Sequence, residues 1–454
     1  MEYRIEHDTM GQVRVPVEHL WGAQTQRSLE HFAIGTETIP REVIRAFAVL
    51  KSAAARTNFA LGKLDQARME AITEACGDIL AGKHPDEFPL KVWQTGSGTQ
   101  SNMNMNEVIS HISALRHPEV TVHPNDHVNM SQSSNDTFPT AMNMAAVLAV
   151  ESQLLPALDQ TLATLRRLEE ENRDVIKIGR THLQDAVPLR FSQEIHGWVG
   201  MLEESRDMIL ESFRHLRKLA IGGTAVGTGL NCPPGFADLC ARNISEMTGR
   251  SFTSSENKFH ALTARDGCVH AHGALKALAA DLMKMANDIR WLAAGPRCGI
   301  AEISIPENEP GSSIMPGKVN PTQCEALTMI AVQVMGNDAA MGFAASQGNF
   351  ELNVFMPVMA YEMLQSIRLL GDGMLSFEKH CLAGLKANRE RMASLVENSL
   401  MLVTCLSPQI GYENAARAAH KAYQEGTTLK EAVLALSLMS EAEYEEKVQP
   451  ENMC

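Results

Sequence analysis

The stretch LKALAADLMKMANDIRWL, residues 275–292, decides the fold class. Its apolar residues are spaced 3, 4, 3, 4 and 3 positions apart, a period that is typical of one helix face and of a coiled-coil-like seam. They are Leu275, Leu278, Leu282, Met285, Ile289 and Leu292. Gly295 follows where a helix C-cap is expected. The stretch therefore predicts a long helix that buries one face against other helices.

Similar patterns extend outward on both sides. Leucines at 158, 162, 165 and 168 form another stripe, and segments near 190–220, 320–346 and 351–383 also indicate helices, about five in all. Several have ~30 residues and would be ~45 Å long. We expect an all-α fold of three domains: an N-terminal domain (1–132), a central bundle of long helices (133–390) and a small C-terminal helical domain (391–454). Turn signals at Ser407-Pro408 and Gly411 divide the last domain.

Composition excludes several classes of function. A formal net charge of -14 argues against nucleic acid or an anionic membrane surface as the main partner. The nine cysteines are scattered without a CxxC pair, which excludes a recognisable zinc ribbon or iron-sulfur run and suits a reducing compartment. The first residues lack a signal sequence, and no run approaches the ~20 apolar residues of a membrane span. We expect a cytoplasmic protein without a metal or cofactor.

Polar islands between the helical segments are the unusual feature. Residues 94–102, QTGSGTQSN, combine glycines with hydroxyl side chains and could present donors to an anion. Taken alone, the stretch is explained better by an ordinary loop that caps the next helix. Residues 131–136, SQSSND, stand ahead of Pro139 and a long helix. One cap residue would suffice there, so four polar residues in a row suggest an anion site at a helix start.

Two more islands carry reactive side chains. Residues 179–185, GRTHLQD, place His182 in a break between two long helices. The sequence there supports a structural and a catalytic role for His182 equally. Residues 310–321, PGSSIMPGKVNP, cannot continue a helix. A solvated linker would not need Ile314, Met315 and Val319, so we interpret this segment as a lid.

Together these islands resemble the aspartase/fumarase superfamily, and GSSIMPGKVNP is the most specific motif. The resemblance runs from Trp21-Gly22-Ala23-Gln24-Thr25 to the C-terminal domain. Residues 93–106 (WQTGSGTQSNMNMN) and 295–308 (GPRCGIAEISIPEN) are similar to the class II fumarases, the metal-independent branch. His182 stands where aspartases are expected to have Gln, and Gly317 where they usually have Ala. The resemblance implies reversible anti addition of water to fumarate, giving (S)-malate in the tricarboxylic acid cycle.

The resemblance also implies roles for individual residues. Ser312 would remove the C3 proton of malate, and His182, supported by Glu325, would handle the leaving water. The expected contacts to the substrate carboxylates are Ser97, Gly98, Thr99, Ser133, Ser134, Asn135, Thr181, Ser313, Lys318, Val319 and Asn320. A second dicarboxylate site of the family would fall on His123, Pro124, Asn125 and Asp126. Val120 stands where a basic residue is expected there.

Physical chemistry adds its own demands. Removing a proton beside a carboxylate creates an aci-carboxylate dianion, which the site must stabilise more than the ground state. Lys318 supplies a positive charge. Ser312 is a poor base at its free pKa and needs donors around its oxyanion.

Helix length bears on assembly. A helix of ~30 residues would separate the Ser133–Asn135 island from His182 by ~45 Å. Both can contact one small dicarboxylate only if they come from different subunits. A homotetramer with shared sites, as in the superfamily, fits this requirement, and the 275–292 seam would then be partly intersubunit core. Two alternatives remain: another fumarate-releasing lyase such as aspartate ammonia-lyase, or a non-catalytic structural protein recruited from the fold.

Overall fold

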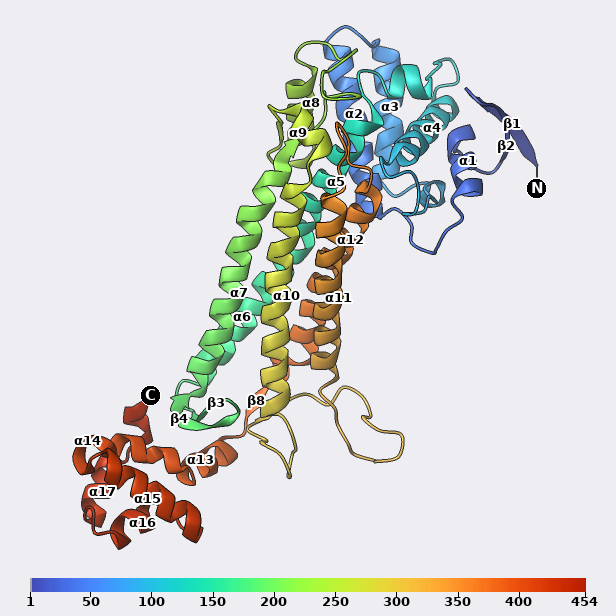
Figure 1. Cartoon of the computed structure of the whole chain (residues 1–454). Helices are drawn as coiled ribbons and strands as arrows, with labels where there is room; N and C mark the ends of the chain where they lie inside the picture. Colours follow the sequence, from blue (N-terminus) through green and yellow to red (C-terminus); the bar gives the residue numbers. More distant parts are fainter. Residues whose placement is uncertain (1) are drawn as a thin grey trace. The chain divides into compact units, whose positions relative to one another are not determined.

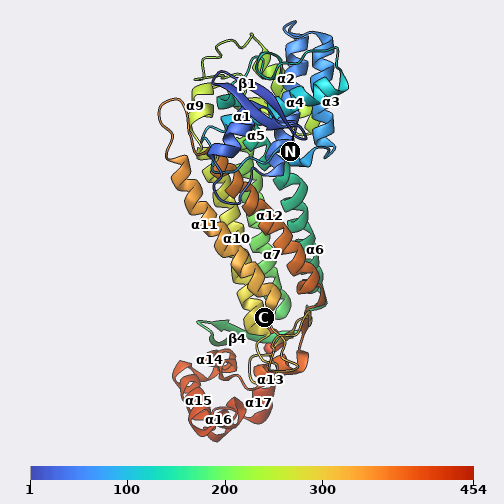
Figure 2. The same cartoon turned by 90° about the vertical axis from the view of Figure 1, so that its right-hand side faces the viewer.

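The computed structural model describes residues 2–454, and its elements are helical almost throughout (Figures 1 and 2). Over these residues it has seventeen α-helices and eight short strands in four two-stranded pairs, which confirms the all-α expectation. Two compact units divide the chain. The first comprises Met1–Pro156, Arg206–Ala279 and Val332–Gly371; the second comprises Ala157–Ser205, Ala280–Ala331 and Asp372–Cys454. The domain limits at residues 132 and 390 stay a prediction.

The first unit contains the N-terminal elements and the segment around residue 240. Its strands are β1 (Tyr3–Asp8), β2 (Gly11–Pro16), β5 (Lys218–Leu219) and β6 (Thr253–Ser254). Its helices are α1 (Ala23–His31), α2 (Arg41–Ala60), α3 (Gln66–Leu80), α4 (Thr99–Arg116), α5 (Ser134–Ala149), α8 (Phe236–Thr248) and α9 (Lys258–Thr263). Short 3-10 or π turns lie at Pro85–Glu87, Pro124–Val128, Val150–Leu154 and Arg214–Arg217. Helix α2 packs against α3, α5 and α8 and is the centre of this unit.

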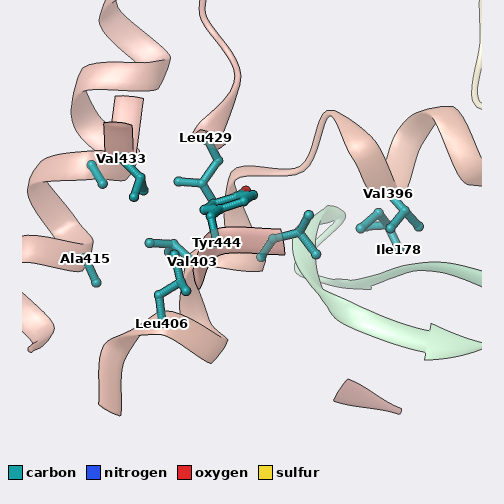
Figure 3. Close-up of a cluster of buried hydrophobic side chains, with 10 residues drawn as sticks. Ile178, Val396, Val403, Leu406, Ala415, Leu429, Val433 and Tyr444 are labelled. Carbon is teal, nitrogen blue, oxygen red and sulfur yellow. The ribbon is translucent and has the colours of Figure 1, made fainter. Parts of the chain in front are cut away.

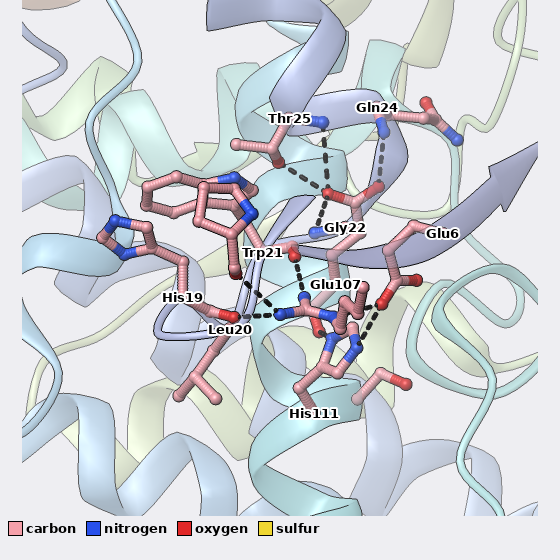
Figure 4. Close-up of polar contacts among 12 residues, drawn as sticks. Glu6, His19, Leu20, Trp21, Gly22, Gln24, Thr25, Glu107 and His111 are labelled. Atoms are coloured by element: carbon pink, nitrogen blue, oxygen red, sulfur yellow. Dashed lines mark hydrogen bonds and ion pairs between the residues drawn. The ribbon is translucent and has the colours of Figure 1, made fainter. Parts of the chain in front are cut away.

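A buried carboxylate ties the N-terminal segment to α4 (Figure 4). Both oxygens of Glu107 accept from the start of α1: Oε2 from the Gly22 amide at 2.9 Å and Oε1 from the Gln24 amide at 2.8 Å. The Thr25 hydroxyl adds a bond of 2.6 Å. Burial raises the pKa of Glu107, while these donors oppose the rise. Glu107 therefore caps α1 from the side of a neighbouring helix.

Five long helical segments contribute most of the remaining chain. They are α5 continued by α6 (Leu155–Glu171), α7 (Phe191–Phe213), α10 (Asp266–Leu292), α11 (Thr322–Ala345) and α12 (Met356–His380). In the first unit, His272 of α10 contacts Asp338 of α11 and Ser366 of α12. In the second unit, Ser205 and Trp198 of α7 bond to Asp281 and Asp288 of α10. Hydrogen-bonded polar pairs thus fix how neighbouring helices align along their axes within each unit.

The predicted apolar seam on α10 is correct, but two inferences drawn from it are wrong. Leu275, Leu278, Leu282, Met285 and Ile289 are 0% exposed within the single chain, and Leu292 is 5% exposed. The seam is therefore intrachain core and leaves no face for another subunit. The helix ends at Leu292, so Gly295, three residues later, is not its C-cap.

The helix Ser134–Glu171 also corrects a sequence expectation. It is apolar and long enough to cross a membrane by length and composition, with a mean hydropathy of 1.3 over its best window. The expectation that no segment is long and apolar enough for a membrane span is therefore wrong, as far as length and composition are concerned. Because 61% of that window is buried inside the protein, the helix has the character of a core helix.

The second unit holds the C-terminal helices and a hairpin that the sequence did not predict. The hairpin is β3 (Ile176–Thr181) paired antiparallel with β4 (Gln184–Arg190); β7 (Ile303–Ser304) pairs with β8 (Lys386–Ala387). The helices are α13 (Arg389–Glu397), α14 (Ser407–Ile410), α15 (Tyr412–Glu425), α16 (Leu429–Ala435) and α17 (Glu441–Lys447). 3-10 turns lie at Leu382–Gly384, Leu400–Leu406 and Pro450–Met453. Gly411, at φ +81°, separates α14 from α15, as its turn signal predicted.

An apolar cluster joins the C-terminal helices to this hairpin (Figure 3). Leu406 and Val433 are fully buried in it, and Tyr444 is 8% exposed. Ile178 of β3, 1% exposed, packs with Val396 of α13 in the same cluster. The C-terminal helices therefore support the hairpin through side-chain packing.

We expect Leu406→Ala to destabilise the C-terminal helices by about 2–5 kcal/mol, because it leaves a cavity among residues that cannot all collapse into it. Denaturant unfolding followed by tryptophan-independent probes such as circular dichroism measures the loss. The matched variant Leu115→Ala removes a leucine that is 68% exposed and should change stability by less than about 0.5 kcal/mol. Equal effects of the two variants would contradict the assignment of this core.

Candidate active site

Two glycines shape the first polar island because no larger residue fits. A Cβ on Gly96 would lie 1.4 Å from the Val354 carbonyl oxygen. A Cβ on Gly98 would lie 2.0 Å from the Phe138 ring, and Gly98 has φ +72° at the N-cap of α4. The island is therefore pressed against buried structure, and its hydroxyl groups have fixed positions.

The hydroxyls of the first and second islands form one chain. Ser97 and Thr99 share a hydrogen bond of 2.9 Å, and Thr99 shares one of 2.7 Å with Ser134. Ser133 is the N-cap of α5 and forms a capping box with Asp136. Asn135 donates from Nδ2 to the Ala225 carbonyl at 2.8 Å. Helix α5 thus begins at Ser134, where the cap fixes its start, and Pro139 lies inside the helix.

A cavity of about 930 Å³ opens on these hydroxyls. Thr99, Ser133 and Ser134 line it, together with amide side chains of Asn102, Asn129 and Gln132. The first-turn amides of α5 and its macrodipole favour a negative charge at this end of the helix. The cavity therefore combines a helix N-terminus with convergent hydroxyl and amide groups, an arrangement suited to a carboxylate.

Lys51, on α2, lies fully buried beneath this cavity. Its Nζ donates to three amide oxygens: Asn102 Oδ1 at 2.7 Å, Gln132 Oε1 at 3.0 Å and Asn129 Oδ1 at 3.1 Å. Burial lowers the pKa of Lys51 to about 7, although the nearby Asp136 charge opposes the shift. A cation thus fixes the amides behind the site.

Asp136 is the carboxylate of this buried layer. It accepts from the Ser133 amide at 2.9 Å and from the Gly222 and Thr224 amides at 3.0 and 2.8 Å. Burial raises its pKa to about 6 in spite of these donors. Asp136 therefore joins the start of α5 to the segment before α8.

His182 stands at the tip of the β3–β4 hairpin in a strained turn. Thr181 pairs with Gln184, so His182 and Leu183 form the two-residue loop, at φ +56° and +59°. Such a turn needs positive φ at both positions and usually takes Asn-Gly. Each L-residue with a side chain pays about 1–2 kcal/mol there. Strain of this kind, at an exposed histidine, points to a functional site.

The segment 310–321 is a closed loop, as its glycines and prolines predict. The Gly311 amide donates to the Lys318 carbonyl at 2.9 Å, and Asn320 Nδ2 donates to the Gly311 carbonyl at 2.7 Å. Inside the loop, Ser312 Oγ accepts from the Met315 amide at 3.1 Å and from the Ile314 amide at 3.3 Å. Ser313 and Lys318 are exposed, and Ile314 is 84% exposed at the tip.

A second cavity, of about 770 Å³, lies beside this loop in the second unit. Lys318, Val319, Asn320 and Glu325 line it; Ser312 does not. Across residues 2–454, no hydrogen bond or ion pair joins His182 to Glu325. The structure therefore brings the predicted residues together in groups: hydroxyls at the first cavity, Lys318 with Glu325 at the second, and Thr181 with His182 on the hairpin.

Only two of the four residues predicted for the second dicarboxylate site line the first cavity. Asn125 and Asp126 line the first cavity, whereas His123 and Pro124 do not. His123 accepts from the Asp126 amide at 3.1 Å and caps the short turn Pro124–Val128. Lys63 also lines the cavity, so a cation is present although Val120 is not basic.

Sequence reasoning missed Lys51 and the buried Glu302. Lys51 stood as a single charge within an apolar, alanine-rich segment (AFAVLKSAAA), and that interruption was the available signal. Glu302 gave no sequence signal, because its partners are distant in the sequence.

One further arrangement, Ser366–His272–Asp338, has the order of a catalytic triad. Ser366 and His272 are 0% exposed, so we assign the three residues to helix packing.

Comparisons with known proteins identify the family. A family model described as "Lyase" matches residues 11–336, and another described as "Fumarase C C-terminus" matches residues 402–454. "Fumarate hydratase class II" of Bacillus subtilis is 63% identical, covering 100% of this chain and 99% of that protein. The protein of the same name from Campylobacter jejuni is 59% identical with the same coverage. The crystal structure of class II fumarase from Schistosoma mansoni superposes with a TM-score of 0.97 at 43% identity, covering 100% and 99% of the two chains.

The depressed pKa of Lys51 gives stability a pH dependence. Folded Lys51 loses its proton near pH 7, but in the unfolded chain it keeps it up to about pH 10.5. The unfolded state therefore binds more protons between these values, and the free energy of unfolding should rise with pH across that window. We expect Lys51→Met to flatten this rise.

Denaturant unfolding at several pH values between 7 and 10 measures the slope for both proteins. Lys51→Met also leaves Gln132 Oε1 without a donor, whereas Asn102 and Asn129 Oδ1 keep other donors. A loss of about 1–3 kcal/mol is therefore expected at pH 7. Lys284→Met, at an exposed surface ion pair, is the control and should keep the wild-type slope. An unchanged slope in Lys51→Met would contradict the lowered pKa assigned to Lys51.

Proposed function

The chain belongs to the lyase family of class II fumarate hydratases and catalyses the reversible addition of water to fumarate, giving malate; from this premise we propose which residues perform the reaction. Ser312 takes the C3 proton of malate, and His182, with Glu325, handles the leaving water. Lys318 and Asn320, with Ser313 and Val319, hold substrate from one side. The hydroxyl island of Ser97, Gly98, Thr99 and Ser133–Asn135, with Thr181, holds it from the other.

The observation that carries this proposal is the pair of amides donating to Ser312 Oγ. A serine hydroxyl is a weak base because its alkoxide is unstable in water. Two backbone donors aimed at Oγ, with Lys318 in the same loop, favour the alkoxide before substrate arrives. The loop closure between Gly311 and Lys318 keeps these donors in place.

Carboxylate binding is supported by the first cavity. The α5 N-terminus, the Thr99 and Ser134 hydroxyls and the buried Lys51 all favour negative charge there. Because these groups are arranged before binding, they stabilise the substrate dianion and the more highly charged intermediate. With a net charge of -14, the whole chain does not attract anions, so attraction must come from this local arrangement.

We propose that the enzyme is a homotetramer whose sites are shared between chains. The helical segment Ser134–Glu171 has 38 residues and includes the π turn Val150–Leu154. A helix of this length measures ~57 Å at 1.5 Å per residue, far more than one dicarboxylate can span. Helix α11 also exposes an apolar stripe that includes Met329 (66%), Val332 (61%) and Phe343 (75%). An unpartnered stripe of this kind supports packing against another copy.

A second dicarboxylate would bind at His123, Pro124, Asn125 and Asp126, with Lys63 supplying the cation. Within residues 2–454 no three His, Cys, Asp or Glu residues gather as a metal site. A cytoplasmic role in the tricarboxylic acid cycle fits the function. The C-terminal match at 402–454 lies within the proposed domain 391–454.

Replacing the proposed base tests the mechanism. We expect Ser312→Ala to lower kcat on the order of 10²-fold or more with KM little changed, because the hydroxyl acts in the transition state. Lys318→Ala should change both constants. Steady-state assays with malate, aspartate and argininosuccinate measure these values and identify the leaving group. Ser251→Ala, at an exposed serine away from both cavities, is the control. If Ser312→Ala keeps near wild-type turnover, Ser312 is not the catalytic base.

Mixing two inactive variants tests the shared site. Asn135→Ala and His182→Ala are denatured and refolded together, and hybrid tetramers then contain some sites with both residues intact. We expect activity to reappear at a fraction of the wild-type level. Wild type refolded under the same protocol is the control. A mixture that stays inactive while wild type recovers would show that each site is complete within one chain.

A further inference from the structure

A buried ion cluster lies directly beneath the hairpin that carries His182. At its centre is Glu302, which is 0% exposed. The Arg180 guanidinium donates to both of its oxygens, at 2.8 and 3.3 Å, and Lys177 Nζ lies 3.3 Å from Oε2. Lys177 is 2% exposed and also pairs with Glu194 at 2.9 Å. Two cations and two carboxylates therefore balance in a water-poor setting.

A register shift interrupts the hairpin beside this cluster. Between the pairs Ile178–Pro188 and Arg180–Asp185, the single β3 residue Gly179 faces two β4 residues, so the bulge lies on β4. A bulge increases the local twist of the paired strands. In this twisted stretch both Arg180 and Lys177 reach Glu302, while Ile178 packs into the C-terminal cluster (Figure 3).

Glu302 is itself tied to two helices. Its amide donates to the Leu292 carbonyl at the end of α10, and its carbonyl accepts from the Asn388 amide ahead of α13, at 2.9 and 2.8 Å. The carboxylate is thus anchored on the helical framework and does not move with the hairpin. A bidentate pair with arginine also fixes orientation, because the two bonds are parallel.

We infer that Glu302 is a positioning residue for His182: through Arg180 and Lys177 it anchors the strand that leads into the strained His182–Leu183 turn. The inference rests on the catalytic role proposed for His182. Two residues with positive φ would relax if the strand could shift, and a displacement of ~1 Å in a catalytic group can cost on the order of 10²-fold in rate. Glu302 prevents that shift from below the strand.

Glu302→Gln tests this role, because it keeps the shape but leaves two buried cations facing a neutral amide. We expect kcat to fall on the order of 10²-fold with KM little changed, as for His182→Asn. In the His182→Asn background, Glu302→Gln should lower kcat by much less than it does alone, because the group it positions is already gone. Steady-state kinetics of wild type, the two single variants and the double variant give the double-mutant cycle.

Glu378→Gln is the matched control. Glu378 is a buried carboxylate of the same unit that accepts from Gln160 and Thr164 at 2.9 and 2.7 Å, and its kcat effect should be equal in both backgrounds. An equal effect of Glu302→Gln in both backgrounds would overturn the positioning role. Wild-type kcat in His182→Asn would instead overturn the proposed function. If Glu302→Gln does not fold, Arg180→Met, which keeps the Lys177 pair, takes its place in the cycle under the same criteria.

Discussion

The packing of the α10 seam is the interaction on which the other features depend. Five of its six apolar side chains are completely buried, and full burial of each contributes about 1.5–3 kcal/mol. No comparable gain exists in the polar loops, which contain positive-φ residues, buried charges and an exposed apolar tip. The loops can keep such unfavourable geometry only because the helices they connect are stable without them.

Buried charge recurs under the polar islands. Lys51 and Asp136 lie behind the α5 N-terminus, Glu107 lies behind α1, and Glu302 lies behind the His182 hairpin. Each is held by fixed partners: amide oxygens for Lys51, backbone amides for Glu107 and Asp136, and two cations for Glu302. Burying a charge is costly, and losing its partners costs more, so such groups discourage alternative loop positions. The buried charged groups thereby fix the positions of the exposed side chains in the loops above them.

Much of the fold could be predicted because long helices repeat their signal many times. The 275–292 helix was correct for that reason. Residues 310–321 are not helical, as their glycines and prolines predicted. The β3–β4 hairpin was missed, since six and seven residues offer too few repeats and its bulge breaks the alternation. Candidate site residues within one island, such as Ser133 and Ser134, could be grouped from the sequence because they are adjacent in it. Glu302 could not, because it lies 122 residues from its partner Arg180.

The left-handed turn at His182 and Leu183 also has a consequence for laboratory evolution. Asparagine adopts this backbone conformation with less strain than histidine, and glycine with less than leucine. Selection for heat resistance alone will therefore favour asparagine at residue 182, a change that removes the imidazole. Libraries intended to yield a more durable catalyst should keep residue 182 constant and screen turnover alongside melting temperature.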